Sequence, residues 1–329
     1  MIKSWSVYLI ACVSLVAILT VIYSSNKKNT TASYFFACAE SCLETRLDKH
    51  IRVLSEEIGE RHFEIPGSLE RTADYIEQEF IAAGLGPVRY SYADNTYHNI
   101  TAGIRGSKKP DEIIIVGAHY DTVWLSPGAD DNASGVAAML EISRSLATFN
   151  AERTIRFVAF ANEEQPFAGT DEMGSTIYAR YVHQQGEKVV AMYSLEMLGY
   201  YSDKPDSQSY PAPLSWFYPD QANFIAFVGN IQSGQLLWQS LNAFKRHSGF
   251  PAQGLIMSER LVPDIRRSDH ASFWDVGYPA VMVTDTAEFR NIHYHTVGDV
   301  IRTLDMKKMA SVVAGLTMML TDLAGINKD

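Results

Sequence analysis

Cysteine is scarce in this chain, with three residues among 329. One of them lies inside an apolar N-terminal run, so the chain cannot form the disulfide framework that stabilises small secreted domains. Cys38 and Cys42 could pair in an oxidising compartment, but packing of two small apolar side chains on a helix is the simpler interpretation. The stability of the fold must therefore come from a hydrophobic core.

Long basic runs are also missing. The chain has 28 Lys and Arg residues against 38 Asp and Glu residues, which gives a formal net charge of −10. Without a Lys/Arg-rich stretch it lacks the electrostatic footprint that phosphate backbones require, so we expect no nucleic-acid partner. A content of 47% hydrophobic and 20% charged residues is that of an ordinary globular protein, and it excludes disorder, collagen and coiled coil.

One long hydrophobic run is present, at residues 7–23 (VYLIACVSLVAILTVIY). It holds no charged side chain and reaches the short end of a membrane span. No small-x-small cleavage site follows it directly, which favours an uncleaved membrane anchor over a cleaved signal peptide or a buried core helix. Lys3 on one side nearly balances Lys27 and Lys28 on the other, so flanking charge does not fix the orientation. We expect the rest of the chain to lie outside the cytoplasm, and to be secreted if the run is cleaved.

The sequence divides into three regions. Residues 1–24 hold the anchor or signal sequence, residues 25–39 form a polar linker, and residues 40–329 suffice for one catalytic-sized domain. No internal repeat is evident, and the stretch at 205–220 is interpreted as an excursion from the domain, not as a linker. Nothing in the sequence specifies an oligomeric state.

Several segments beyond residue 40 are apolar at consecutive positions, a pattern that suits strands buried on both faces of a sheet. The expected strands are HNITAGIRG (98–106), EIIIVGAHY (112–120), TIRFVAFAN (154–162), VVAMYSLEM (189–197), NFIAFVGN (223–230) and YPAVMVTD (278–285). Helical patterns lie between and after them. The alternation predicts an α/β fold of three layers, with a mixed, largely parallel sheet covered by helices on both faces.

Helical periodicity is clearest at 68–84, 133–148 and 305–324. In the first of these segments, Ser68 is the expected N-cap and Gly84 marks the expected end. The apolar face of that helix consists of four side chains: Leu69, Ala73, Ile76 and Phe80.

Side chains that can bind a metal or transfer a proton follow the points where the apolar strands end. Because ligands bind at the carboxyl ends of strands in open α/β sheets, residues far apart in the sequence are expected to converge on one crevice. The candidates are His119, Asp121, Asp130, Asp131, Glu163, Glu164, Glu196, His293 and His295. Carboxylates at the end of an apolar strand are costly to bury without a metal or a proton. The adjacent aspartates could instead cap the next helix.

Two imidazoles with several carboxylates form a ligand set that Zn²⁺ accepts, and the absence of thiolates argues against a closed structural zinc site. Two Zn²⁺ ions contribute a charge of +4, and the carboxylates of Asp131, Glu164 and Glu196 contribute −3. One bridging hydroxide would therefore make the cluster neutral. Two metals can hold a nucleophilic hydroxide and polarise a carbonyl at once. Peptide-bond hydrolysis has this requirement.

The motifs GAHYDT, GADDNASG, NEE, SLEMLGY, SDHASF and HYHT occur in this order along the chain. Together they resemble the co-catalytic zinc exopeptidases of metallopeptidase family 28, the group that includes secreted bacterial leucyl aminopeptidases. The resemblance runs from about residue 50 to the C-terminus. It implies an aminopeptidase that hydrolyses N-terminal residues of peptide substrates with two zinc ions. No protease-associated domain is inserted, so the chain resembles a compact member of the family.

The resemblance also implies a set of metal ligands. His119 would bind one zinc, Asp131 would bridge the two metals, and Glu164 would bind the other zinc. Glu196 and His295 would complete the two sites. Position 196 is most often Asp in the best-known members, and the extra methylene of Glu moves the carboxylate by about 1.5 Å. That departure bears on the affinity and the identity of the second metal.

Two further roles follow from the resemblance. Glu163 would be the general base, which takes a proton from water and returns it to the leaving amine. Asp121 would orient the imidazole of His119. His293 and His295 are interchangeable by spacing alone, but His295 fits the family pattern because a Thr and then Asp299 follow it.

Other functions on the same fold are possible from the sequence. A glutaminyl cyclase-type acyltransferase would use a single zinc, and a carboxypeptidase-like hydrolase could grip a substrate carboxylate with Arg266 and Arg267. A non-catalytic interaction domain is the remaining alternative. Asp269 and His270 are expected to shape the substrate side of the pocket or to be structural. Aromatic side chains that could line it are Phe167, Tyr200, Tyr201, Trp274 and Phe289.

Overall fold

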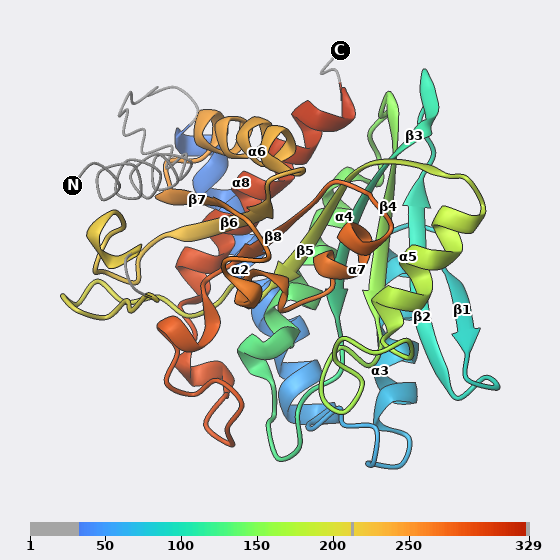
Figure 1. Cartoon of the computed structure of the whole chain (residues 1–329), viewed down its shortest axis with the longest axis horizontal. Helices are drawn as coiled ribbons and strands as arrows, with labels where there is room; N and C mark the ends of the chain where they lie inside the picture. Colours follow the sequence, from blue (N-terminus) through green and yellow to red (C-terminus); the bar gives the residue numbers. More distant parts are fainter. Residues whose placement is uncertain (1–32, 212–213, 327–329) are drawn as a thin grey trace, which may run out of the picture.

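The computed structural model of the chain describes residues 33–211 and 214–326. Within these residues one sheet of eight strands runs through the molecule in the order β1-β2-β4-β3-β5-β8-β6-β7 (Figure 1). The strands are Val88–Tyr92 (β1), Tyr97–Ile104 (β2), Lys109–His119 (β3), Arg153–Phe160 (β4), Lys188–Glu196 (β5), Ile225–Asn230 (β6), Ala252–Met257 (β7) and Ala280–Thr284 (β8).

The middle of the sheet is parallel. Strand β3 pairs in parallel with β4 and β5, and β5 pairs in parallel with β8. The carboxyl ends of these four strands therefore lie at one edge. Antiparallel pairs join β1 to β2, β2 to β4 and β6 to β8, while β6 and β7 are parallel. The mixed, largely parallel sheet expected from the sequence is confirmed, although β1 and β7 were not among the expected strands.

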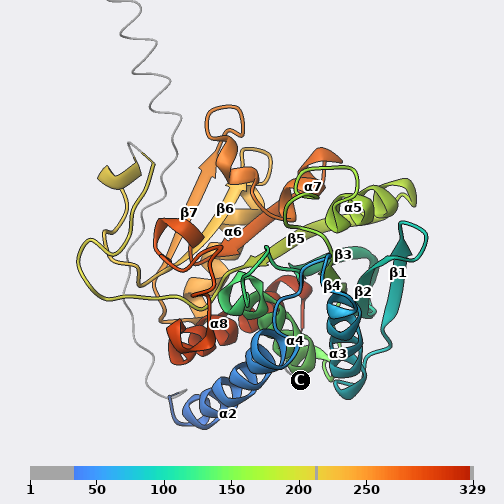
Figure 2. The ribbon, with the colours of Figure 1, turned by 90° about the horizontal axis from the view of Figure 1, so that it is seen from below.

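Helices cover both faces of the sheet. They are Ser33–Arg52 (α2), Ser68–Ala82 (α3), Gly135–Leu146 (α4), Gly174–Gln184 (α5), Gly234–His247 (α6), His270–Asp275 (α7) and Met306–Ala324 (α8). Figure 2 shows α2, α3, α4 and α8 on one face of the sheet and α5 with α7 on the other. Two hydrophobic clusters correspond to these faces, and the larger one includes the buried side of α6. The three layers expected from the sequence are present.

The apolar face predicted for the helix at 68–84 is buried. Ala73, Ile76 and Phe80 are completely inaccessible, and Leu69 is half-buried against the same core. The expected N-cap is wrong by one position, because Gly67 caps α3 without a side-chain bond. Ser68 is the first helical residue, and its hydroxyl donates to the carbonyl oxygen of a preceding residue.

The helix α2 begins at Ser33, inside the range 25–39 that the sequence assigned to a polar linker. The apolar run at 7–23 lies outside the described residues. Among the helices that are described, none combines the length and apolarity that crossing a bilayer requires. Cys42, on α2, is an exposed free thiol.

Candidate metal centre

The candidate ligands gather where the parallel strands end. His119 is the last residue of β3 and Glu196 is the last residue of β5. Glu164 follows the end of β4, and His295 lies in the connection that follows β8. Asp131 lies in the turn Ala129–Ser134, directly before α4. Parallel pairing thus brings to one edge of the sheet residues that are far apart in the sequence, as expected.

These side chains form two groups that share one carboxylate. In the first group, Nε2 of His119 lies 3.3 Å from Oδ1 of Asp131 and 3.4 Å from Oε2 of Glu196. In the second, Nε2 of His295 lies 3.1 Å from Oδ2 of Asp131 and 3.3 Å from Oε1 of Glu164. The ligand atoms of each group lie within 4.8 Å of one another. Asp131 therefore offers one oxygen to each group.

The residues present fit a pair of bound cations. Nε2 of His119 and Oδ1 of Asp131 are buried and make no hydrogen bond to any described residue. Buried polar atoms are ordinarily paired, so unpaired atoms that point at each other mark a place for another ligand or ion. Imidazole nitrogens with carboxylate oxygens are a donor set that zinc accepts.

The electrostatics of the metal-free site also indicate a place for positive charge. Burial disfavours the charged form of His119, but the carboxylates of Glu196 and Glu163 outweigh it and raise the pKa well above its ordinary value. Burial likewise opposes the charge on His295, yet hydrogen bonds that its imidazole donates to the carboxylates of Asp131 and Glu164 raise its pKa to about 10. The surrounding carboxylates thus favour positive charge at both imidazoles, which a bound cation would also supply.

Glu163 is placed differently from the ligands. Its side chain is half-buried at the cavity and lies beside His119 and Glu164, with which it forms a third close group. Burial is the main cause that raises the pKa of its carboxyl well above the ordinary value, and the neighbouring carboxylate of Glu164 raises it further. A carboxyl group with a raised pKa suits proton transfer near neutral pH.

Asp121 holds two parts of the site together. Its Oδ1 accepts a hydrogen bond from the backbone N–H of Glu163 and its Oδ2 accepts one from that of Glu164, both at 3.0 Å. The same carboxylate lies 3.4 Å from Nδ1 of His119. The position predicted for Asp121 is consistent with orienting the imidazole, and the contact to the Glu163–Glu164 backbone is an addition that the sequence did not indicate.

The turn that carries Asp131 is fixed from two sides. The carboxylate of Asp299 accepts hydrogen bonds from the backbone N–H groups of Asp130 at 2.8 Å and Asp131 at 3.0 Å. Asn132 donates to the carbonyl oxygen of Leu195 at 2.8 Å, next to Glu196. The turn that carries the shared carboxylate is therefore bonded, through the neighbouring Asn132, to the strand that bears another ligand of the first group.

Two supporting residues were missed by the sequence analysis. The hydroxyl of Ser268 donates to Oε2 of Glu196 at 2.6 Å and lies 2.9 Å from the hydroxyl of Ser194. Arg61 is completely buried and donates to the carbonyl oxygens of Tyr120 and Gly128, both at 2.8 Å. Ser268 opens the motif SDHASF, but its contact to Glu196 joins positions distant in the sequence, and Arg61 belongs to none of the six motifs.

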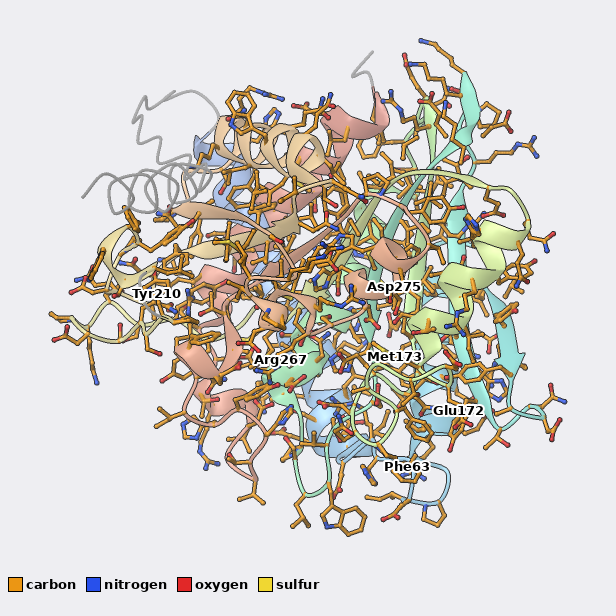
Figure 3. The ribbon with its side chains drawn as sticks, viewed as in Figure 1. Phe63, Glu172, Met173, Tyr210, Arg267 and Asp275 are labelled. Atoms are coloured by element: carbon orange, nitrogen blue, oxygen red, sulfur yellow. The ribbon has the colours of Figure 1, made fainter. Side chains whose placement is uncertain are left out.

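A cavity of about 540 Å³ opens beside the two groups. Figure 3 labels four of its lining residues, Met173, Tyr210, Arg267 and Asp275, which come from separate segments. The strands β6, β7 and β8 supply an apolar inner wall. Its side chains are Ala226, Val228, Leu255 and Met282.

A second wall of the cavity, called the outer wall below, comes from residues 205–211 and 214–220. Tyr210, Leu214 and Tyr218 of this segment line the cavity, and the rings of Tyr210 and Tyr218 are stacked. The segment connects β5 to β6. The excursion expected from the sequence is therefore part of the pocket.

Several residues singled out in the sequence do not line the cavity. Asp269 and His270 are buried outside it, and the ring of His293 packs near Tyr200 instead of joining a metal-binding group. Of the aromatic candidates, Phe289 alone is among the lining residues. The others serve core or loop packing, for which an aromatic pattern in sequence is equally suited.

The two arginines considered as a grip for a substrate carboxylate are already paired. Arg266 forms ion pairs with Glu259 and with Asp275, the latter at 2.7 Å. Arg267 pairs with Glu288 and donates to the hydroxyl of Tyr294 at 3.0 Å. Because both guanidinium groups are already paired with carboxylates, they are less suited to bind a substrate carboxylate.

The chain is similar in sequence to known proteins over most of its length. YfbL of Escherichia coli K12, described as uncharacterized, is 38% identical over 289 residues, which cover 84% of this chain and 87% of that protein. Aminopeptidase YwaD of Bacillus subtilis 168 is 28% identical over 228 residues, or 67% of this chain and 43% of that protein.

Solved structures share the fold. A zinc aminopeptidase from Bacillus subtilis superposes with a TM-score of 0.67 at 16% identity, covering 87% of this chain and 98% of that chain. A glutaminyl cyclase from Bacteroides thetaiotaomicron, bound to N-acetylhistamine, gives a TM-score of 0.62 at 17% identity, with coverages of 84% and 97%. Residues 99–319 of the present chain match peptidase family M28. The chain belongs to that family.

Proposed function

We propose that this protein is a zinc-dependent aminopeptidase that binds two zinc ions. The observation that carries the proposal is the shared carboxylate: Asp131 gives one oxygen to His119 and the other to His295. A single-metal site has no need of a carboxylate placed between two sets of ligands. Membership of peptidase family M28 and the aminopeptidase relatives support the same activity.

The ligands divide between the two groups. His119 and Glu196 would hold one ion, Glu164 and His295 would hold the other, and Asp131 would bridge them. When bound, the two ions would activate water and polarise the carbonyl of the scissile peptide.

The protein's own groups would move the proton and select the substrate. Glu163, at the cavity, would accept a proton from the attacking water on a carboxylate oxygen and pass it to the nitrogen of the leaving amine. A free α-amine is cationic at neutral pH, so the acidic surroundings favour a peptide with an unblocked N-terminus. The cavity beside the ligands would hold the side chain of the N-terminal residue.

Metal analysis followed by turnover tests the proposal. Zinc per full-length chain is measured by elemental analysis, and hydrolysis of leucine p-nitroanilide is followed on the same sample, with N-acetylleucine p-nitroanilide as the blocked control. Two zincs with cleavage of the unblocked substrate alone support the proposal. Two other substrates separate the alternatives: a glutaminyl peptide that cyclises without hydrolysis indicates the acyltransferase, and trimming of an N-blocked peptide from its C-terminus indicates the carboxypeptidase. A metal-free, inactive protein contradicts all three enzymes.

We further propose that residues 7–23 anchor the chain in a membrane with its catalytic part outside the cytoplasm. The support is the uncharged apolar run and the polar stretch that follows it. Carbonate extraction of membranes, with mass spectrometry of the intact chain, tests this location. A full-length chain that resists extraction supports the anchor. A chain shortened at its N-terminus in the soluble fraction shows cleavage instead.

A further inference from the structure

The outer wall of the cavity is attached to the loop that carries His295. This wall belongs to the segment 205–220, and its side chains Tyr210, Leu214 and Tyr218 face the cavity. Figure 3 shows Tyr210 on this segment, at the side of the molecule away from the edge formed by β1. The position of this wall beside the apolar side chains of β6, β7 and β8 determines how much apolar substrate surface the cavity can bury.

Gln208 makes the attachment. Its side chain is 6% exposed, and its Oε1 accepts a hydrogen bond from Nε of Arg290 at 2.8 Å. Its Nε2 donates to the hydroxyl of Thr286 at 2.9 Å. Both partners lie between the end of β8 and His295. Longer bonds join its Nε2 to the carbonyl oxygen of Phe289 at 3.4 Å and its Oε1 to the hydroxyl of Thr286 at 3.3 Å. One amide side chain thus bonds to three residues of the loop that bears a metal ligand.

Neighbouring bonds extend the attachment. The backbone N–H of Ser209 donates to the carbonyl oxygen of Phe289 at 2.7 Å, and the hydroxyl of Ser209 donates to the same oxygen at 2.8 Å. The backbone N–H of Gln208 donates to the carbonyl oxygen of Asp220, at the other end of the segment, at 2.9 Å. The described part of the segment is therefore docked on the His295 loop through residues 208 and 209, and on β7 through the hydroxyl of Tyr218, which donates to the carbonyl oxygen of Gly254 at 2.8 Å.

Arg290 is itself held in place. Its Nη1 donates to the carbonyl oxygen of Phe224 at 2.9 Å, and its guanidinium lies 4.6 Å from the centroid of the Phe224 ring. Its side chain is buried, so the position that Gln208 bonds to is fixed by the core and not by solvent. A truncation at Gln208 therefore loosens the wall next to Tyr210, while Ser209, Tyr218 and Arg290 keep their own partners.

We propose that Gln208 is a positioning residue that fixes the outer wall of the cavity and thereby sets the preference for large apolar N-terminal residues. This inference rests on the proposed aminopeptidase function. A phenylalanine or leucine side chain presents a large apolar area to the cavity lining, and its binding depends on how much of that area is buried. An alanine methyl group is too short to bury comparable area. Loss of the attachment therefore weakens the binding of large substrates more than the binding of small ones.

Three variants test the inference. Gln208→Ala removes all hydrogen bonds of the side-chain amide, and Gln208→Glu keeps an acceptor for Arg290. Gln239→Ala is the matched control, because Gln239 is exposed on α6 and does not line the cavity. KM and kcat are measured with the p-nitroanilides of alanine, leucine and phenylalanine. Amide hydrogen exchange of residues 207–210 and 286–290 is measured on the same proteins.

For Gln208→Ala we expect faster exchange in both segments and a KM for the phenylalanine substrate that rises about tenfold more than that for alanine, a difference of about 1.4 kcal/mol. We expect Gln208→Glu to restore most of the protection and the preference, and Gln239→Ala to match the wild type. Equal changes for all three substrates, or unchanged exchange in Gln208→Ala, overturn the inference.

The exchange measurement also keeps the two proposals apart. If the wild-type protein hydrolyses none of the substrates, the proposed function fails, and exchange still decides whether Gln208 fixes the wall. If Gln208→Ala does not fold, the preference and exchange of Gln208→Leu are measured instead. Leucine retains the bulk of the side chain and lacks both hydrogen-bonding groups.

Discussion

Oδ1 of Asp121 lies 3.4 Å from Nδ1 of His119 while the same carboxylate binds the backbone of the residue proposed as general base. We predict that Asp121→Asn lowers zinc affinity by about 10- to 100-fold, because the amide loses the charge that orients the imidazole. Competition with a chelator measures the affinity. Asp111→Asn, an exposed change on the same strand β3, is the control. Equal affinity in the two variants would remove Asp121 from this role.

The proposed base can be separated from the ligands by an isosteric change. We predict that Glu163→Gln retains the wild-type zinc content but loses about 10²- to 10⁴-fold in kcat, because glutamine cannot accept the proton. Elemental analysis and p-nitroanilide hydrolysis are the two measurements. Glu172→Gln, an exposed change in the same connection and labelled in Figure 3, serves as the control. Loss of zinc in Glu163→Gln, or retention of full activity, contradicts the assignment.

Glu196 depends on a hydroxyl for its position. Ser268 donates to its Oε2 at 2.6 Å. We therefore predict that Ser268→Ala lowers the affinity of the group formed by His119 and Glu196 for its metal ion by about tenfold or more. The group made by Glu164 and His295 makes no such contact and should be affected less. Stepwise removal of zinc by a chelator resolves the two populations. A uniform loss from both, or no loss, would count against this role of Ser268.

Ser268 has a backbone φ of 135°, a region that favours glycine. Ser268→Gly therefore relieves strain while it removes the hydroxyl. Ser268→Gly should weaken zinc binding as much as Ser268→Ala does. Its thermal stability should not fall below that of Ser268→Ala.

Arg61 stabilises the fold through carbonyl groups instead of a directly bonded carboxylate. Besides Tyr120 and Gly128, it donates to the carbonyl oxygens of Leu54 at 3.0 Å and Pro127 at 2.7 Å. We predict that Arg61→Met destabilises the protein by at least about 3 kcal/mol, because several buried acceptors lose their donor together. Urea unfolding measures the loss. The exposed Arg71→Met, on α3, should cost much less, and similar losses in the two variants would refute the argument.

Stability should fall at acid pH through His270. Burial lowers the pKa of this histidine from 6.5 to about 4, so between these values the unfolded chain binds the proton more tightly. The contribution to stability, about 3 kcal/mol, is complete above pH 6.5 and is lost as pH falls toward 4. Unfolding free energies of wild type and His270→Gln, compared from pH 7.5 to 4.5, should converge. The exposed His183→Gln should run parallel to the wild type. A constant difference for His270→Gln would show that its titration is not coupled to folding.

The central strands and the ligands were predictable because they obey local rules. Strands β3, β5 and β6 are buried on both faces and appear in the sequence as continuous apolar runs. The ligands stand where such runs end. The edge strands β1 and β7 are half-buried and have no such run, so their assignment depended on pairing partners elsewhere in the chain.

The supporting contacts could not be predicted in the same way. Ser268 reaches Glu196 across 72 positions and Gln208 reaches Arg290 across 82. A serine and a glutamine in polar stretches are also typical of solvated loops. Their partners are set by the folded topology, and a single sequence carries no periodic signal for such pairs.

The outer wall and the ligands belong to different parts of the chain. The ligands follow β3, β4, β5 and β8 or precede α4, whereas the wall is one surface connection between β5 and β6. Surface connections tolerate insertions and deletions better than the elements that they join. Descendants of this protein could therefore diverge in substrate range by exchanging that connection while inheriting the chemistry unchanged. Each new connection would again need an acceptor for the hydrogen bond that Arg290 donates.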